Sequence, residues 1–397
     1  MAKLDATPHA DPLLIAGGGI GGLTAALKLA EAGFHIHVFE QADMLTESGA
    51  GLQLSPNALR ILREMGILEK LRGKTGRSNS LRVMSGVDGK QLTEMPLGDI
   101  AQKRWGAPYL VAHRADLQQA LLEACEASDN IMLHLGCRTL DYSAEHGVQF
   151  RYEQNGAQKE QKGCALIGAD GVHSRIRALL LNDGDPLFSG YVAYRAQFNA
   201  RDLPRMLSAD STYLWLAPNL HAVHYKLRGD MINLVAIVRE DSLQKNQDEM
   251  AMPEILQDAS RNYTGTLRTL LNIPQNWTRW PLFHRLPDTK TWPHLPVTLL
   301  GDAAHPMLPF LAQGAAQAVE DADVLTNCLI NEPQYPDDAF ENYRARRMKR
   351  VTKIQKAAAE NGKVFHYSGL RAFARNNVLK MIGGRRMMAL YDWVYGA

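Results

Sequence analysis

The first hydrophobic segments of the chain alternate between the spacing of a buried strand and that of a helix. Residues 13–16 form a short apolar run that is typical of a buried strand. The apolar spacing from Leu23 predicts a helix that ends before Gly33, and residues 34–39 predict a second strand. A strand, a glycine-rich turn, a helix and a strand in this order predict a βαβ unit at 11–41.

The pattern after this unit predicts strands and helices in mixed order. We expect strands at 81–87, 91–95, 131–135, 148–152, 164–167 and 297–300, helices at 58–65, 113–127, 252–263 and 314–330, and a glycine-rich loop at 48–57. Residues 191–238 alternate aromatic and β-branched residues, which predicts an antiparallel sheet, and the chain from Asp338 is mostly helical in pattern.

These segments predict an α/β fold with an interleaved organisation. We expect a Rossmann-like dinucleotide-binding domain from 1–180 and 285–330, because its strands and helices alternate on both sides of the predicted antiparallel sheet. The sheet would form an inserted substrate lobe at 181–284, and 331–397 would form a C-terminal helical segment.

Composition narrows the class of protein. The 397 residues are 46% hydrophobic and 22% charged with a net charge of +2, which is typical of a globular protein and gives no case for nucleic acid or an anionic membrane. The basic clusters at 344–350 and 385–386 are expected to be solvated helix faces. No apolar run reaches the ~20 residues of a membrane span. The polar start of the chain carries no secretory signal, so we expect a cytoplasmic monomer or homodimer.

The four cysteines lie far apart and form no CxxC pair. We therefore expect free thiols and no metal site.

The glycine turn carries the first chemical signal. Gly17 suits a tight turn, Gly19 would let the backbone approach a pyrophosphate, and Gly22 would let the helix pack closely on the strand. Glu40, about 20 residues further on, is placed to hold a ribose diol. The turn therefore predicts a bound adenine dinucleotide, and by itself it does not separate NAD from FAD.

A second signal follows the predicted strand at 297–300. Asp302 stands at the carboxyl end of that strand, and a helix begins near Gly314 and Ala315. A carboxylate beside a helix N-terminus suits a flavin, since the acid can accept a ribityl hydroxyl and the amides can stabilise negative charge on the reduced ring. A helix cap and a packed turn explain the same residues.

Two weaker signals lie between these segments. Asp170 and Gly171 form another strand-end acid and small-residue turn, which a purely structural turn also explains. Arg114 and Gln118 stand at helical spacing and could both reach a cofactor, although a solvated surface pair has the same spacing.

Together these pieces resemble the group A flavoprotein monooxygenases, the FAD-dependent aromatic hydroxylases of the para-hydroxybenzoate hydroxylase superfamily. Three family fingerprints stand in order along nearly the whole chain: Gly17-x-Gly19-x-x-Gly22 with Glu40, Asp170-Gly171 with Ser174 and Arg177, and Gly301-Asp302-Ala-Ala-His305-Pro306. The phrases HRADLQ and SGYVAYRA resemble the subgroup of salicylate hydroxylase, 3-hydroxybenzoate 6-hydroxylase and 6-hydroxynicotinate 3-monooxygenase.

The resemblance implies a cofactor set and a reaction. FAD would be bound by the residues named above, with Glu40 on the adenosine ribose, Arg114 and Asp302 at the pyrophosphate and ribityl chain, and Gly314 and Ala315 facing the ring. NADH or NADPH would visit as a transient reductant, and O2 would be the co-substrate. The implied oxidant is a flavin C4a-hydroperoxide, which attacks an electron-rich ring such as the phenolate of a small aromatic acid.

A general base would supply that phenolate. In the subgroup the histidine after the turn at Pro218 matches the proposed base, and here it is His221. Tyr225 and His224 are the other candidates. The spacing of His221 and His224 puts them on opposite faces of a strand, so one of them would face a pocket. His305 beside Asp302 is better explained as a turn residue than as a catalytic partner.

The sequence limits the choice of substrate less than it limits the choice of cofactor. Pro309 stands where the resemblance leads us to expect a glutamine in 3-hydroxybenzoate 6-hydroxylases, which favours a salicylate-type reaction that releases CO2 and yields a catechol. The alternatives are 3-hydroxybenzoate 6-hydroxylation, 6-hydroxynicotinate 3-hydroxylation and hydroxylation of a quinolone. Arg82, Arg195 and Arg228 could each hold a substrate carboxylate.

Two other classes of protein remain open. One is a flavin-binding redox sensor without turnover, and the other is an NAD-dependent dehydrogenase. The dehydrogenase leaves the Gly301-Asp302 segment without a role.

Overall fold

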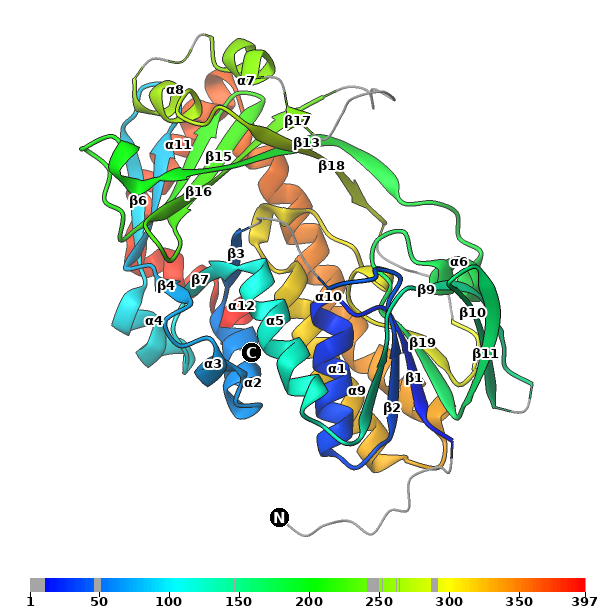
Figure 1. The fold of residues 1–397 in the computed structure, drawn as a ribbon. Helices are drawn as coiled ribbons and strands as arrows, with labels where there is room; N and C mark the ends of the chain where they lie inside the picture. The colour runs from blue at the N-terminus through cyan, green and yellow to red at the C-terminus, as the bar shows by residue number, and fades with distance from the viewer. Residues whose placement is uncertain are drawn as a thin grey trace.

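The computed structural model describes residues 11–45, 51–145, 147–240, 250–251, 253–261, 263, 265–286 and 292–396. Two sheets form the two halves of the molecule. A parallel sheet with its helices lies at the lower right of Figure 1, and a larger sheet lies at the upper left. The long helix α10 (Pro336–Phe365) runs from one half to the other.

The parallel sheet has five strands, in the order β19 (Val297–Leu299), β12 (Ala165–Gly168), β1 (Leu13–Ala16), β2 (Ile36–Phe39) and β8 (Ile131–His134). Every residue of β1 and β12 is buried because both faces of the sheet are covered. One face packs against α1 (Ile20–Glu31), α5 (Arg114–Glu126) and α9 (Gly314–Asn331). The other face packs against β9 (Cys137–Ser143) and β10 (Val148–Gln154).

The predicted βαβ unit is confirmed, with one shift. Helix α1 begins at Ile20, three residues before the predicted start at Leu23, because Gly19 is its N-cap and the last glycines of the turn already have helical conformation. The strand β11 (Ala157–Gly163), which pairs with β10, was not predicted. Its sequence is polar and mostly exposed, so it lacks the apolar alternation of a half-buried strand.

The larger sheet has eight strands: β17 (Met250–Ala251), β18 (Trp277–His284), β13 (Leu187–Asn199), β16 (Met231–Arg239), β15 (Leu220–Lys226), β14 (Thr212–Ala217), β5 (Ser80–Ser85) and β6 (Gln91–Pro96). Neighbouring strands are antiparallel except for β14 and β5. The predicted antiparallel sheet at 191–238 is therefore confirmed and is wider than expected. It takes β5 and β6 from within 1–180, so the inserted lobe of 181–284 does not contain the whole sheet.

Helices cover the larger sheet on one face and at one edge. The helices α7 (Pro253–Ala259) and α8 (Thr266–Leu271) close the apolar core of one face. The helix predicted at 252–263 ends at Ala259, and residues 252 and 262 lie outside the described part. Helix α11 (Gly369–Leu390) packs along β6, which confirms the helical prediction for the C-terminal segment.

The remaining elements are a small sheet and several helices. They are the sheet β3 (Gly51–Leu54), β7 (Leu110–His113) and β4 (Thr75–Arg77), with α2 (Pro56–Glu64), α3 (Ile67–Lys70), α4 (Gly98–Trp105), α6 (Arg175–Leu181), α12 (Asp392–Tyr395), η1 (Ala200–Asp202), η2 (Gly301–Ala303) and η3 (Pro309–Leu311). Residues 48–50 of the predicted loop lie outside the described part, and 51–54 form β3 instead of a loop.

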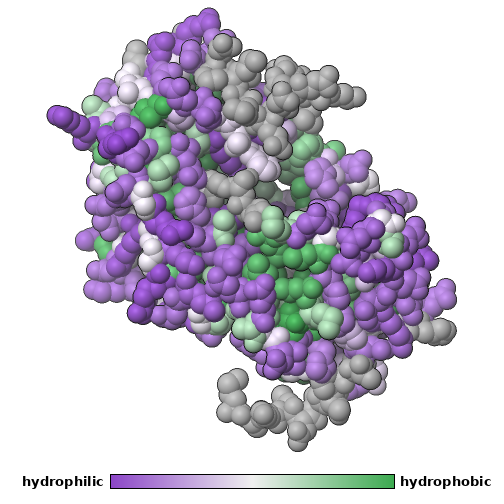
Figure 2. Space-filling view, in the orientation of Figure 1, coloured by the Kyte–Doolittle hydropathy of each residue, from purple (hydrophilic) through white to green (hydrophobic). Residues whose placement is uncertain are grey.

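Most of the face shown in Figure 2 is hydrophilic, and apolar residues gather over α1. In the described ranges no helix has the length and apolar character to cross a membrane, and no cluster of three metal-ligating side chains occurs. All four cysteines are free.

Candidate active site

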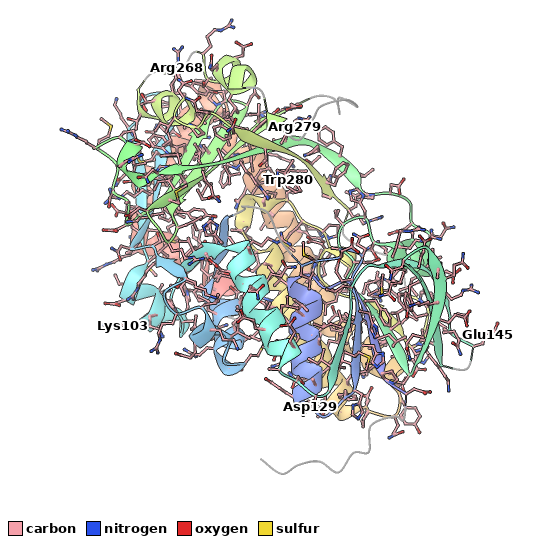
Figure 3. All side chains as sticks on the ribbon, viewed as in Figure 1. Lys103, Asp129, Glu145, Arg268, Arg279 and Trp280 are labelled. Carbon is pink, nitrogen blue, oxygen red and sulfur yellow. The ribbon has the colours of Figure 1, made fainter. Side chains whose placement is uncertain are left out.

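A cavity of about 470 Å³ lies between the two halves of the molecule. The parallel-sheet half contributes the glycine turn, the start of α5, the segment after β12, η2 and the start of α9. The larger sheet contributes residues of β13, β15, β16 and β18. Trp280 of β18 is labelled between the two halves in Figure 3. One cavity therefore joins the predicted dinucleotide site to the predicted substrate lobe.

The glycine turn is held by two contacts that leave no room for a side chain. Gly17 has φ of +112°, and a Cβ there would lie 2.3 Å from the carbonyl oxygen of Ala169. A Cβ at Gly22 would lie 2.0 Å from the carbonyl oxygen of Gly17. Gly19 lines the cavity, and a Cβ there would meet nothing within 4 Å. The turn is therefore tightly packed behind and open in front, where a phosphate can approach backbone amides.

Two polar side chains lie against this turn. Glu40 accepts hydrogen bonds from the amides of Gly18 at 2.7 Å and Ala42 at 2.9 Å, and it does not line the cavity. Gln118 is buried and donates to the carbonyl oxygen of Gly18 at 3.4 Å. Its Oε1 has no hydrogen-bond partner among the described residues. An unsatisfied buried acceptor is costly, so it marks a place for a donor from a ligand.

Asp302 stands at the carboxyl end of β19, beside the first turn of α9. Its carboxylate is exposed to the cavity although it lies deep in the protein. Burial raises the pKa of Asp302, and the positive charge of the nearby Arg114 opposes this shift. Gly314 and Ala315 begin α9 and line the same cavity. The structure thus brings a carboxylate, a guanidinium and a helix N-terminus together.

Asp170 has a structural role in this geometry. Its Oδ1 accepts from Ser174 Oγ at 2.5 Å, and its Oδ2 accepts from the backbone amides of Arg175 and Ile176. Asp170 therefore caps the start of α6. The cavity is lined instead by the neighbouring Gly171.

The two candidate histidines lie on opposite faces of β15, as the spacing predicts. His221 and Tyr225 line the cavity. His224 points into the apolar core under α7 and α8, where it stacks on Tyr213 and burial lowers its pKa to about 3. Of the two histidines, His221 is the one that can reach a substrate in the cavity.

His221 is buried in an aromatic setting. Its Nδ1 lies 2.8 Å from Nε2 of His366, the residue that ends α10. Phe310 and Phe365 pack edge-on against its ring, with centroids 5.2 and 5.3 Å away. Burial lowers the pKa of His221 well below its ordinary value, and a positive charge on His366 lowers it further. His221 is therefore a neutral imidazole at pH 7.

Tyr225 lies on the same face of β15, two strand repeats from His221. Burial raises its pKa above the ordinary value, and Tyr109 adds to this effect while Arg195 opposes it. The phenol of Tyr225 is therefore protonated at neutral pH and can donate a hydrogen bond.

The structure separates the three arginines that sequence alone could not rank. Arg82 bonds to Glu94 and Tyr213 on the outer part of the sheet. Arg228 makes two hydrogen bonds of 3.1 Å to Asp116. Neither of them lines the cavity, whereas Arg195 of β13 does. The guanidinium carbon of Arg195 lies 5.3 Å from the ring centroid of Trp280.

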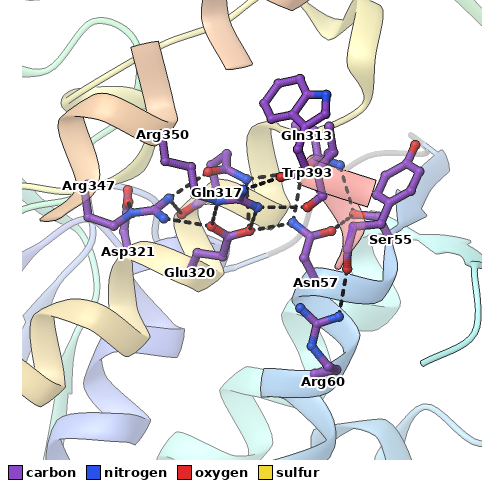
Figure 4. Close-up of polar contacts among 12 residues, drawn as sticks. Ser55, Asn57, Arg60, Gln313, Gln317, Glu320, Asp321, Arg347, Arg350 and Trp393 are labelled. Carbon is purple, nitrogen blue, oxygen red and sulfur yellow. Dashed lines mark hydrogen bonds and ion pairs between the residues drawn. The ribbon is translucent and has the colours of Figure 1, made fainter. Parts of the chain in front are cut away.

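A buried polar network fixes the start of α9 from behind (Figure 4). The side chain of Gln313, the N-cap residue of α9, donates to Ser55 Oγ at 3.0 Å and accepts from Asn57 at 3.0 Å. Asn57 also donates to Glu320 at 2.6 Å. These contacts tie the cavity-facing first turn of α9 to α2.

Two arginines of α10 complete this network. Arg347 donates to Asp321 at 2.6 Å, to Glu320 at 2.7 Å and to Gln317 Oε1 at 2.7 Å, and Arg350 donates to Glu320 at 2.7 Å. Burial alone would raise the pKa of Glu320 and Asp321, but the opposite charges hold both below their ordinary values. The prediction that 344–350 is a solvated face is therefore wrong for Arg347 and Arg350.

His305 also belongs to this network. Its Nε2 lies 2.5 Å from Asp321 Oδ2, which also accepts from the amide of Gly301 at 2.9 Å. His305 therefore orders the turn after β19 and does not pair with Asp302. Arg177 supports the same turn, since it donates to the carbonyl oxygens of Ala303 and Ala304 and to Asp183.

The residues of the cavity fit FAD. The open front of the glycine turn and the amides at the start of α9 offer donors for a dinucleotide that crosses from the turn to Asp302. Gln118 does not line the cavity, and its unsatisfied Oε1 lies against the turn. The sheet face with His221 and Tyr225 closes the far side of the cavity, where a ring substrate can lie against the flavin.

Comparison with known proteins agrees with this site. A family model described as an FAD binding domain matches residues 11–358. The chain is 36% identical over 387 residues to a 3-hydroxybenzoate 6-hydroxylase of Polaromonas naphthalenivorans (strain CJ2), which covers 97% of this chain and 96% of the relative. It is 33% identical over 354 residues to a 6-hydroxynicotinate 3-monooxygenase of Pseudomonas fluorescens, covering 88% and 90% of the two chains.

A solved structure shows the same fold. A salicylate hydroxylase in complex with its substrate superposes with a TM-score of 0.81 at 24% identity, and the match covers 97% of this chain and 96% of that one.

Proposed function

We propose that this chain, which belongs to the family of FAD-dependent aromatic hydroxylases, adds one oxygen atom to the ring of a small hydroxybenzoate. The observation that carries the proposal is the single cavity that joins the FAD-binding residues to the sheet face with His221, Tyr225 and Arg195. FAD held by these residues would pass electrons from NADH or NADPH to O2, and this would supply an electrophilic oxygen.

The cofactor-binding residues divide the work along the cavity. The amides of the glycine turn would hold the pyrophosphate. The free Oε1 of Gln118 would accept a hydrogen bond from a hydroxyl of the cofactor, because an ionised pyrophosphate has no hydrogen to donate. Asp302 would accept a ribityl hydroxyl, and the amides at Gly314 and Ala315 would face the ring. Glu40 would exchange its bond to the Gly18 amide for the adenosine ribose.

His221 is the proposed base. Electrophilic attack is faster on a phenolate than on a phenol, so the substrate hydroxyl has to lose its proton near the flavin. His221 is neutral and lines the cavity, and its Nδ1 is occupied by His366, which leaves Nε2 for that proton. Tyr225 would donate a hydrogen bond that helps to orient the substrate oxygen.

Arg195 is the proposed partner of the substrate carboxylate. It is the one of the three sequence candidates that lines the cavity, and Trp280 packs against its guanidinium. A guanidinium binds a carboxylate with two parallel hydrogen bonds, which would fix the ring in one orientation.

The relatives and one residue of the cavity favour different substrates. Relatives from several organisms carry the name 3-hydroxybenzoate 6-hydroxylase, and this supports ring hydroxylation of 3-hydroxybenzoate as the first proposal. Pro309 lines the cavity where the family resemblance leads us to expect a glutamine, and this supports a salicylate-type reaction as the second.

The test is substrate-stimulated NADH and NADPH oxidation with 3-hydroxybenzoate, salicylate and 6-hydroxynicotinate, with identification of the product. We expect 2,5-dihydroxybenzoate from 3-hydroxybenzoate, in an amount equal to the nicotinamide consumed. Catechol and CO2 from salicylate would select the second candidate. FAD-loaded protein without any NADH or NADPH oxidation would refute both and favour a redox sensor.

A further inference from the structure

Two buried histidines from distant parts of the chain form a hydrogen-bonded pair beside the cavity. His221 comes from β15 of the larger sheet, and His366 ends helix α10. Their Nδ1 and Nε2 atoms lie 2.8 Å apart, and both side chains are more than nine-tenths buried. The other ring nitrogen of His366, Nδ1, has no hydrogen-bond partner within the described residues. Among the described residues, the His366 ring therefore has its hydrogen bond to His221.

The contact has to contain a hydrogen atom. Two ring nitrogens at 2.8 Å would repel if both presented lone pairs, so one of them donates to the other. If His221 donates from Nδ1, its Nε2 presents a lone pair to the cavity. If His366 donates instead, Nε2 of His221 carries the hydrogen and cannot take a proton. The direction of this bond therefore decides whether His221 is a base.

The surroundings of His366 keep its ring neutral, and a neutral ring can accept a hydrogen bond. Burial and the cations Arg239 and Arg375 together lower the pKa of His366 to about 4. Tyr191 packs against the same ring, with centroids 5.0 Å apart, and burial raises the pKa of Tyr191 so that it stays neutral. A neutral His366 can accept at Nε2 while its own hydrogen sits on Nδ1, and the role of His221 as a base requires this tautomer.

Helix α10 holds His366 firmly in this place. Gln355 donates to the carbonyl oxygen of Pro306 at 3.1 Å, and Asn361 donates to that of Phe310 at 3.1 Å. After the helix, Arg375 donates to the carbonyl oxygens of Val364 and Phe365 at 2.9 Å. These bonds fix the end of α10 between the segment that leads into α9 and helix α11.

We propose that His366 is a positioning residue that accepts the Nδ1 hydrogen of His221 and so turns the Nε2 lone pair of His221 toward the substrate. The inference rests on the proposed function, in which His221 takes the proton of the substrate hydroxyl. When His221 becomes positively charged, His366 stabilises it by the same hydrogen bond, without a carboxylate. This support offsets the burial that makes His221 a weak base.

The test compares two substitutions of His366. His366→Gln keeps a side-chain acceptor, whereas His366→Phe keeps an aromatic ring and removes the acceptor. We expect His366→Phe to bind FAD and to keep KM within about twofold, while kcat at pH 7 falls about 10- to 100-fold. Because a higher pH supplies the phenolate from solution, kcat of this variant should recover as the pH rises. His366→Gln should lose less than about fivefold.

The control is His294→Phe at the other end of α10, where an exposed histidine contacts Asp337, and it should leave kcat and its pH dependence unchanged. Equal losses in the Phe and Gln variants without a change in pH dependence would reduce His366 to a packing role and overturn the inference. Unchanged kinetics in His366→Phe would overturn it as well.

A second readout does not depend on turnover. In protein labelled with ¹⁵N-histidine, the signals lost in His221→Asn identify His221. We expect its Nε2 to show the shift of an unprotonated nitrogen in the unaltered protein and to lose it in His366→Phe. A protonated Nε2 in the unaltered protein would refute the inference even if no substrate were turned over. Failure of the proposed function would appear separately, as FAD-loaded protein that hydroxylates none of the tested acids.

Discussion

Replacement of Arg347 by methionine tests how the buried network supports the flavin site. Arg347 is 4% exposed and bonds to two carboxylates, those of Asp321 and Glu320, at 2.6 and 2.7 Å. Methionine has a similar length and no charge, so the substitution leaves two buried carboxylates with less compensation. Breaking a buried ion pair from one side costs about 3–5 kcal/mol. Since whole proteins are stable by about 5–15 kcal/mol, the loss should be large.

The loss of stability in this variant should depend on pH, and the pKa shifts give the direction. In the unaltered protein the pKa of Asp321 and Glu320 is lowered, so their stabilising effect is present above the unfolded values, near pH 4, and is lost as the pH falls below them. Without Arg347 both pKa values should rise, although Glu320 still has Arg350 and Asp321 still has His305 as partners. The variant then gains stability by protonation, relative to the unaltered protein, as the pH falls through these raised values. The deficit in free energy of unfolding should therefore shrink at acidic pH.

Urea unfolding at pH 7 and pH 5 measures this deficit. The matched control is Arg346→Met, one residue earlier on the exposed face of α10, where we expect less than about 0.5 kcal/mol. Equal effects of the two substitutions, or a deficit that grows as the pH falls, would refute the account of the network.

Three further predictions concern the cavity. Gly22→Ala should destabilise the protein and abolish FAD binding, because its Cβ would lie 2.0 Å from the Gly17 carbonyl oxygen. Gly19→Ala should keep the unfolding midpoint of the FAD-free protein and weaken FAD binding at least tenfold in fluorescence titrations. Arg195→Gln should raise KM for a hydroxybenzoate about 10- to 100-fold and leave KM for an uncharged phenol unchanged. The control is Arg82→Gln, which should change neither KM. Equal effects of Arg195→Gln on both substrates would contradict the carboxylate role. Ala312→Gly should raise the free energy of unfolding by about 1 kcal/mol in thermal or urea unfolding, because Ala312 has φ of +51° in the left-handed region. An unchanged free energy of unfolding would contradict strain at this turn.

The parallel half of the fold could be predicted from local patterns. The strand at 13–16 is buried on both faces and therefore reads as a continuous apolar run, and the glycine turn has a fixed geometry. The opposite faces of His221 and His224 follow from the two-residue repeat of a strand. In contrast, β11 is polar and exposed, so no burial pattern marks it.

The buried charges and the histidine pair could not be predicted in the same way. Arg347 lies in a basic cluster that looks like a solvated helix face, and its burial depends on Glu320 and Asp321 in another helix. The acidic pair between Val319 and Ala322 was the available signal, since such charges need partners when buried. His366 is 145 residues from His221, and no local pattern connects them.

The most direct test of the central claim is a turnover experiment under ¹⁸O2 with 3-hydroxybenzoate, salicylate and NADH or NADPH. The account predicts a hydroxylated product that carries one ¹⁸O atom per molecule, formed in an amount equal to the nicotinamide oxidised. FAD-loaded enzyme that oxidises the nicotinamide yet leaves both acids without ¹⁸O would contradict it.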